Sequence, residues 1–256
     1  VKEEYLLSKT YQGNSIEYKV YGDYALFSDI LTRAGGEKFT MQIPTYEAIK
    51  GITNSIYFKP TFMWVIDKVR VIKPIQTERK GIRTMAYNKN KPDLSYYTYL
   101  KDVEYQVMAH IEWNENRPEL EEDRIMLKHC SIANRMLQRG GRRSIFLGVS
   151  ECFGYVEPCK FGEGESFYDN SGRLDYGVTY HGITYPDEAI NEDDKGYMTV
   201  RFWQPATVNG VIEFIRPEDC TIKRHIKKMP IKPFDVEQNN FSGIQEFLGG
   251  EELELD

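Results

Sequence analysis

The residues best suited to chemistry lie in one segment, residues 124–143, with the sequence RIMLKHCSIANRMLQRGGRR. This segment contains six Lys or Arg residues and no Asp or Glu, in a chain whose formal net charge is -6. Lys128 and His129 are adjacent at its centre, and the segment ends in Gly-Gly-Arg-Arg. Cations bind phosphate groups, and an imidazole exchanges protons near neutral pH. The combination indicates a site that holds a phosphodiester and moves protons around it.

RNA strand scission without a metal ion has three requirements: the 2'-hydroxyl loses a proton, the charge at phosphorus is neutralised, and the leaving 5'-oxygen is protonated. His129 can accept or donate a proton, and Lys128 can neutralise charge. Glycines allow close backbone approach to a phosphate, and arginines add forked donors. The candidate RNA-binding residues are Arg124, Arg139, Gly140, Gly141, Arg142 and Arg143.

Tyr46 is the other candidate catalytic residue, because it lies in the first turn of a helix that we expect to start after Pro44 and Thr45. With an ordinary pKa near 10, a tyrosine is a poor base but a usable acid or hydrogen-bond donor. Each candidate also has a simpler interpretation. The Lys-His pair can be a solvated helix face, Tyr46 can cap the core, and Gly-Gly can merely end a helix. The residues alone leave these interpretations open.

Composition argues against several other classes of protein. No segment approaches the roughly 20 apolar residues of a membrane span, and the first residues do not resemble a signal peptide. The four cysteines lack metal-ligand spacing, and no carboxylate cluster is visible, so we expect no metal site and no cofactor. We therefore expect a cytoplasmic protein with no membrane contact.

The acidic total is concentrated in the last part of the chain. Residues 235–256 contain seven acids and no base, and without them 32 acids face 33 bases. A nucleic-acid partner is therefore compatible with the overall acidic charge, because binding depends on where charge lies. Nonspecific DNA binding is a further expectation for the basic segment. Such an acidic stretch is also typical of a mobile tail.

Periodicity predicts the elements that must position these residues. Residues 15–27 and 62–75 are expected strands, 81–98 a hairpin or long loop, and 99–113 the longest strand. Helices are expected from Pro44 to about residue 58 and from 124 to 138, and SIFLGVS (144–150) is expected to return as a strand. From Cys152 onward, short alternating runs predict an antiparallel sheet.

This order predicts an α+β fold: a ferredoxin-like (RRM-type) βαββαβ domain followed by a small antiparallel β-sheet subdomain. The expected divisions are residues 15–150 for the ferredoxin-like domain, 151–225 for the β subdomain and 226–256 for an acidic, mobile tail.

The chain resembles one CRISPR-associated family, the Cas-five family in its subtype I-C (Dvulg) branch of the RAMP superfamily. The resemblance covers most of residues 15–220. The matching runs, in order, are YGDYALFSD (21–29), GGEKFTMQIPTYEAIKGI (35–52), SIYFKP (55–60), KPIQT (73–77), LSYYTYLKDVEYQV (94–107), DRIMLKH (123–129), RGGRRSIFLGVSECFGYVEPC (139–159) and FYDNSG (167–172).

The resemblance implies a metal-independent endoribonuclease that cuts precursor CRISPR RNA near the base of the repeat hairpin. It implies 2'-hydroxyl attack that leaves a 2',3'-cyclic phosphate and a 5'-hydroxyl. The protein would then hold the 5' handle of the crRNA as a subunit of the type I-C interference complex. The family's catalytic Tyr, Lys and His are expected at Tyr46, Lys128 and His129, and its glycine-rich loop at residues 140–143.

Two other classes compete with this reading. A non-catalytic subunit that binds only the crRNA handle would need no Tyr-Lys-His set. A carbohydrate-binding β-protein would use the many aromatic residues but would have no use for the acid-free basic segment.

Overall fold

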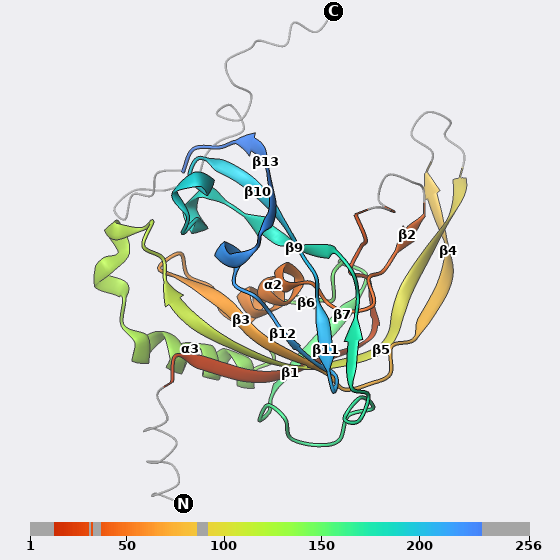
Figure 1. Ribbon diagram of the computed structural model, residues 1–256. Helices are drawn as coiled ribbons and strands as arrows, with labels where there is room; N and C mark the ends of the chain where they lie inside the picture. Colours follow the sequence, from red (N-terminus) through yellow and green to blue (C-terminus); the bar gives the residue numbers. More distant parts are fainter. Residues whose placement is uncertain (1–12, 31, 33–36, 86–91, 232–256) are drawn as a thin grey trace, which may run out of the picture.

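The computed structural model describes residues 13–30, 32, 37–85 and 92–231 of the 256-residue chain. The sheets that these residues form are mostly antiparallel, and helices are few (Figure 1). The expected α+β class is therefore confirmed. The helices are α2 (Tyr46–Ile56) and α3 (Met126–Gln138), and short 3-10 turns are η1 (Pro118–Asp123), η2 (Pro186–Glu188), η3 (Glu192–Asp194) and η4 (Pro217–Asp219).

The large sheet has the strand order β6-β7-β1-β5-β3-β12-β11-β8, with β2 and β4 also paired to β5. Every pairing in it is antiparallel except the short parallel pair of β2 and β5. Its strands are β1 (Ser15–Ala25), β2 (Lys38–Phe39), β3 (Phe62–Val71), β4 (Thr77–Met85), β5 (Pro92–Trp113), β6 (Ile145–Phe146), β7 (Phe153–Pro158), β8 (Arg173–Asp175), β11 (Ala206–Val208) and β12 (Val211–Glu213).

The small sheet has the order β13-β10-β9, formed by β9 (Thr179–Thr184), β10 (Tyr197–Trp203) and β13 (Ile222–Lys228). Helix α2 lies between it and the large sheet (Figure 1). The Glu47 carboxylate of α2 accepts a hydrogen bond from the Ile183 amide of β9 at 3.2 Å and pairs with Arg201 of β10 at 3.4 Å. Helix α2 is thus held on both sides.

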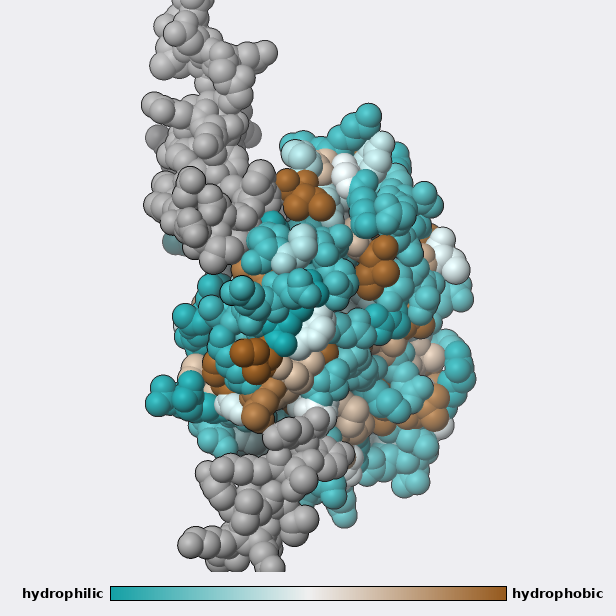
Figure 2. All heavy atoms as spheres, turned by 90° about the vertical axis from the view of Figure 1, so that its left-hand side faces the viewer, coloured by the Kyte–Doolittle hydropathy of each residue, from teal (hydrophilic) through white to brown (hydrophobic). Residues whose placement is uncertain are grey.

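One continuous core joins the two helices to the large sheet. Alternate residues of β1 and β5 point inward, such as Tyr18 and Val107, which are fully buried. Leu137 of α3 and Ile49 of α2 belong to the same cluster. Seen from the side of the segment that joins β5 to α3, the surface is mainly hydrophilic and its hydrophobic side chains form separate small patches (Figure 2).

The expected strand at 144–150 is wrong beyond its first residues. Only Ile145 and Phe146 pair as β6, and the strand that lies beside β1 is β7. The chain turns at Gly148, whose φ is +95°, and a Cβ there would lie 2.1 Å from the Leu26 carbonyl oxygen. Only glycine can make this close approach, because it has no Cβ.

The expected domain divisions stay predictions. Strand β7, which follows the first expected division, pairs with β1 in the large sheet. Residues 226–228, at the start of the expected tail, belong to β13. The rest of the acidic stretch, from residue 232 onward, lies outside the described residues.

Candidate active site

Helix α2 ends at the candidate site. The Thr45 side chain caps its start by accepting a hydrogen bond from the Ala48 amide at 3.1 Å, as expected for a Thr at this position. Its last residue is Ile56, and Tyr57 follows in extended conformation. The Trp64 indole N–H donates to the Tyr57 carbonyl oxygen at 2.7 Å. The Tyr57 backbone is thereby fixed where the chain leaves the helix.

His129 lies near the start of α3 and meets Tyr57. The Tyr57 hydroxyl lies 2.9 Å from His129 Nδ1, and His129 Nε2 lies 2.7 Å from the backbone carbonyl oxygen of Asp123. A carbonyl oxygen only accepts, so Nε2 carries a proton. In the neutral imidazole Nδ1 then accepts, and the Tyr57 hydroxyl donates to it. The contacts therefore select one tautomer and one direction of hydrogen bonding.

The Tyr57–His129 pair is closed off from solvent. The exposed fractions are 2% for Tyr57 and 0% for His129. The imidazole also packs against the rings of Phe62 and Trp113, with distances between ring centroids of 5.1 and 5.9 Å. Burial, together with the nearby Asp123 charge, raises the pKa of Tyr57 above its usual value. Tyr57 is therefore a protonated donor at neutral pH.

Lys128 is more exposed than its neighbour and forms an ion pair with the Asp123 carboxylate. The same carboxylate accepts a hydrogen bond from Thr61 at 2.8 Å and lies 3.5 Å from His129 Nε2. Burial acts to raise the pKa of Asp123, but hydrogen bonds from Lys128 and Thr61 outweigh it, and the pKa is lowered. Asp123 thus links the lysine to the histidine.

The glycine-rich loop lies against the same end of α2. Gly140 and Gly141 have positive φ, which ends α3 and turns the chain. The backbone amides of Arg142 and Arg143 then donate to the Ser55 carbonyl oxygen at 3.1 and 3.0 Å. Both arginine side chains are exposed. The loop therefore presents two arginines beside Ser55, two positions before Tyr57.

The other two candidate arginines differ from each other. Arg139 is exposed. Arg124 is instead engaged within the fold, since its guanidinium pairs with Glu115 at 3.1 Å and donates to the Asn114 carbonyl oxygen at 3.0 Å. Arg124 therefore supports the segment before α3 rather than presenting a free cation.

Tyr46 lies apart from Lys128 and His129. It occupies the first position of α2, and a rise of 1.5 Å per residue puts it roughly 16 Å from Tyr57 along the helix. Its ring stacks on His181 at 4.5 Å, and its hydroxyl lies 3.5 Å from the Ile66 amide. Burial raises its pKa well above the usual value. The first turn of α2 faces the small sheet, which is why Tyr46 is buried there.

Sequence reasoning missed Tyr57, which takes the place expected for Tyr46 beside His129. A signal was present: Tyr57 lies in SIYFKP, at the end of the predicted helix and just before the proline that ends it. A residue at the end of a helix is as close to a neighbouring segment as one at its start, so position along the helix could not decide between the two tyrosines.

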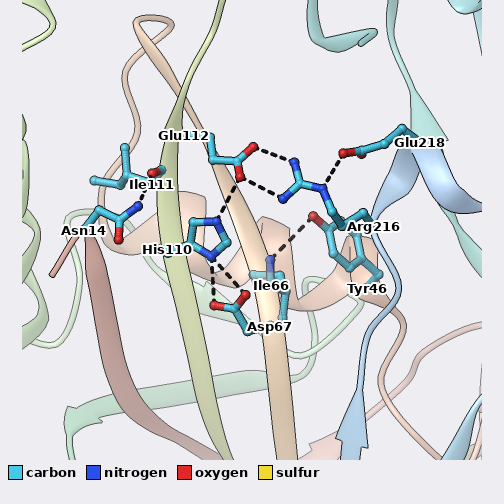
Figure 3. A network of polar contacts seen from close by, with 9 residues as sticks. All are labelled: Asn14, Tyr46, Ile66, Asp67, His110, Ile111, Glu112, Arg216 and Glu218. Carbon is cyan, nitrogen blue, oxygen red and sulfur yellow. Dashed lines mark hydrogen bonds and ion pairs between the residues drawn. The ribbon is translucent and has the colours of Figure 1, made fainter. Parts of the chain in front are cut away.

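Sequence reasoning also missed a second charged network, on β3 and β5 (Figure 3). His110 lies 2.9 Å from Asp67 and 3.1 Å from Glu112, and Glu112 holds Arg216 by two hydrogen bonds of 2.7 Å. Arg216 also pairs with Glu218. Hydrogen bonding to Asp67 raises the pKa of His110, and hydrogen bonding to Arg216 lowers that of Glu112 to about 2. The network ties the chain after β12 to the large sheet.

Groups of potential metal ligands and helices able to span a membrane are both absent from the residues that the structure describes. These residues contain no group of three or more His, Cys, Asp or Glu side chains placed to hold a metal ion. Neither of the described α-helices has the length and apolar character needed to cross a membrane.

The fold and the contacts above define an α+β protein whose candidate site is a cationic cluster where its two helices meet. The chain belongs to the CRISPR-associated Cas5 family, because the sequence model of that family, described as CRISPR-associated protein (Cas_Cas5), matches residues 15–215. The resemblance inferred from the sequence is thereby confirmed.

Individual relatives agree with this assignment. A crystal structure of a CRISPR-associated protein has a TM-score of 0.69 and 33% identity, covering 82% of this chain and 96% of the other. The functionally uncharacterized protein SMU1763c from Streptococcus mutans has a TM-score of 0.67 and 36% identity, with the same coverage of 82% and 96%.

One curated relative carries a functional name, CRISPR pre-crRNA endoribonuclease Cas5d, from Mannheimia succiniciproducens. It is 38% identical over 119 residues, which cover 38% of this chain and 52% of that protein. The chain thus matches about half the length of this curated relative.

Proposed function

We propose that this protein is an endoribonuclease that cleaves precursor CRISPR RNA near the base of the repeat hairpin without a metal ion. The observation that carries the proposal is the hydrogen-bonded Tyr57–His129 pair beside Lys128, next to the exposed Arg142 and Arg143. Membership of the Cas5 family and the functional name of the Mannheimia relative support it. In this proposal Tyr57 replaces Tyr46 as the catalytic tyrosine.

The proposed reaction is an attack of the 2'-oxygen on the adjacent phosphorus. The bond between phosphorus and the 5'-oxygen breaks, leaving a 2',3'-cyclic phosphate and a 5'-hydroxyl. One proton leaves the 2'-hydroxyl, and one proton is taken up by the 5'-oxygen. Tyr57 and His129 are hydrogen-bonded to each other and can together carry out these two proton transfers. Lys128 supplies positive charge where the phosphorane develops negative charge.

The burial of His129 sets a condition on this mechanism. An imidazole with 0% exposure cannot touch a phosphate, so RNA must displace the cover formed by Asp123 and Lys128. A phosphate is a suitable competitor, because it can take the place of the Asp123 carboxylate at the lysine ammonium. RNA binding would then free Lys128 and open the way to the Tyr57–His129 pair.

Arg139, Arg142 and Arg143 are proposed to hold the RNA backbone beside this opening. All three are exposed, and two follow glycines that allow close approach to a phosphate. Arg124 is left out of this group because it is bound to Glu115. After cleavage, we propose that the protein keeps the 5' handle and joins the type I-C interference complex through its other subunits.

We also infer that β1, α2, β3, β5, α3 and β7 form a ferredoxin-like unit. Their order along the chain is βαββαβ, and their order in the sheet is β7-β1-β5-β3 with antiparallel neighbours, which supports this assignment. In this scheme β9, β10 and β13 are the small β-sheet subdomain that follows.

The decisive experiment compares two tyrosine variants on the repeat RNA of the protein's own locus, with EDTA present. Tyr57→Phe is expected to lower the single-turnover cleavage rate by about 10²-fold or more, the range for loss of a positioned proton donor. Tyr46→Phe is the matched control and should cleave at the wild-type rate, because its hydroxyl lies at the other end of α2. Equal rates for the two variants would contradict the proposed site.

The competing function is a subunit that binds the crRNA handle without cutting it. A substrate with a single 2'-deoxy residue before the scissile phosphate separates the two. The proposal expects this RNA to bind normally and stay intact while the all-ribose RNA is cut. A wild-type protein that binds both RNAs and cuts neither would favour the binding subunit.

A further inference from the structure

Strand β13 is a basic edge that the proposed cleavage site does not use. All seven of its residues, IKRHIKK, are exposed, and four are Lys or Arg with no acid among them. Within the part of the chain that the structure describes, it pairs only with β10 and forms the edge of the small sheet. An edge strand with this density of positive charge is suited to an anionic, extended ligand.

The cations of β13 divide into two groups by their partners. Lys223 and His225 point toward Asp194, at 2.9 and 3.2 Å, so one buried carboxylate is shared between them. Arg224, Lys227 and Lys228 lie on the same exposed strand and make no ion pair with any described residue. These three residues carry the net charge of the surface.

A bulge helps to place two of these three cations, Arg224 and Lys227, on one face of the small sheet. The register of β10 and β13 shifts between Met198 and Thr199, so that Ile226 is skipped on β13. Arg224 lies opposite Val200 and Lys227 opposite Met198, two half-buried residues of the outer face of β10. The inner face carries buried residues such as Thr199 and Arg201. Arg224 and Lys227 therefore project from the side of the small sheet that faces away from α2. Lys228 lies opposite Tyr197 and projects from the other side, so RNA that contacts all three must run along the exposed edge of β13.

The spacing of these cations suits a phosphate backbone. From Arg224 to Lys228 a strand rises about 13 Å, and one strand of a nucleic-acid duplex carries a phosphate about every 3.4 Å. This length spans about four phosphate steps of one strand, so each of the three cations can contact a phosphate of the same backbone. An acidic protein segment would need regularly placed carboxylates at the same density, so the repeating charge of nucleic acid fits better.

We propose that Arg224, Lys227 and Lys228 form a second RNA-backbone surface, separate from the cleavage site. Figure 1 shows β13 and α3 at opposite ends of the molecule. Only an RNA that extends well beyond the cleavage site can contact both. This inference rests on the proposed function, because it assigns β13 to the same precursor RNA.

The test measures how the affinity for the precursor repeat RNA, with its flanking sequence and a 2'-deoxy block against cleavage, depends on salt. Arg224→Gln, Lys227→Gln and Lys228→Gln combined should weaken binding and reduce the slope of log affinity against log salt. The expected reduction is about 2 for single-stranded and up to about 2.7 for duplex contacts. Glutamine preserves most of the side-chain length, which keeps packing and solubility comparable.

The matched control removes three lysines that already have acidic partners, Lys68 with Glu213, Lys73 with Asp102 and Lys101 with Glu78. This control variant changes the net charge by the same amount as the β13 variant, and it should alter the slope of log affinity against log salt much less. Equal slopes for the two triple variants would overturn the proposal, as would a β13 variant with the wild-type slope. In that case β13 carries its charges to block edge-to-edge pairing of strands or to bind an acidic protein.

The measurement also separates this proposal from the cleavage proposal. Binding is measured on RNA that cannot be cut, so a failure of the catalytic residues leaves the slope unaffected. Conversely, the β13 variant should cut all-ribose RNA at the wild-type rate once the RNA is saturating. A loss of rate at saturation would mean that β13 acts in the chemistry, and it would overturn the assignment to a separate surface.

Discussion

The hydrogen bond between Tyr57 and His129 defines the tautomer of the neutral imidazole before any RNA is present. Nδ1 accepts from the phenol and Nε2 donates to the Asp123 carbonyl, so the imidazole has no free nitrogen. A histidine in this state becomes reactive only when one of its two partners moves. In the proposed reaction, Tyr57 and Asp123 are therefore as important as the histidine itself.

At the residue scale, we expect His129→Ala to lower single-turnover cleavage by about 10²-fold or more while RNA affinity changes little. The side chain is buried, so the variant will also lose thermal stability. His181→Ala is the matched control, because His181 is equally buried but contacts Tyr46 and the Ile215 carbonyl oxygen. It should lose stability and keep the cleavage rate. If both variants lose activity in proportion to their loss of stability, His129 has only a structural role.

Of the three expected catalytic residues, Lys128 and His129 lie together in the structure and Tyr46 lies apart from them, and the catalytic role of all three stays a prediction. Lys128 and His129 are adjacent in the chain, so no fold could separate them. Which tyrosine lies beside His129 depends on the angle at which α2 crosses α3, and a sequence pattern does not give that angle. Arg124 was grouped with the other arginines by charge, although the acids just before it provided its partner, Glu115.

At the scale of elements, strands and helices with strong periodicity were predicted well. The predicted start of α2, the strand at 62–75 and the long strand at 99–113 correspond to α2, β3 and most of β5. The segment 144–150 was predicted as a strand because its apolar run resembles one. The decisive contact there, Gly148 against Leu26, joins residues far apart in sequence.

The turn at Gly148 gives an element-scale prediction. Gly148→Ala should destabilise the protein by about 1–2 kcal/mol from backbone strain and a further 1–3 kcal/mol from steric overlap with Leu26. Gly162→Ala is the control, because Gly162 also has positive φ but a Cβ there meets nothing within 4 Å. Denaturant midpoints of the two variants measure the difference. Similar midpoints would mean that the 147–152 turn adjusts freely.

At the scale of the whole molecule, charge is segregated rather than averaged. Basic surfaces lie at α3 with its following loop and at β13, while acids gather before α3 and in residues 235–256. The first basic surface and the terminal acids were evident from the sequence. The unpaired positive charge of β13 was not evident from the sequence, because residues far from β13 in the chain determine which of its cations already form ion pairs.

The network around His110 predicts how the stability of the whole fold depends on pH. The pKa of His110 is raised above its usual value, so its contribution is complete below about pH 6.5 and is lost as pH rises through the folded-state pKa. The pKa of Glu112 is lowered to about 2, so its contribution is present above its ordinary pKa and is lost as pH falls toward 2. The network is therefore strongest in mildly acidic solution.

We expect the unfolding free energy of the wild-type protein to decline as pH rises above about 6.5, and His110→Gln to remove part of that decline. Denaturant unfolding at several pH values, for wild type and variant, measures this. The variant should approach the wild type at the alkaline end, where His110 is neutral in both the folded and unfolded states. Parallel curves over the whole range would show that His110 does not gain a proton on folding.

The aromatic wall around the candidate site has an optical consequence. Trp113 lies edge-on against His129, and the Trp64 indole is hydrogen-bonded to the Tyr57 carbonyl oxygen, so two of the three tryptophans touch the same cluster. The third, Trp203, packs against His181 and Phe214 beneath the small sheet. Indole emission responds to neighbouring charge and to water. The protein therefore carries an intrinsic fluorophore at the place where, in the proposed mechanism, RNA displaces Asp123. We expect the tryptophan emission to change when the site opens, without any attached label.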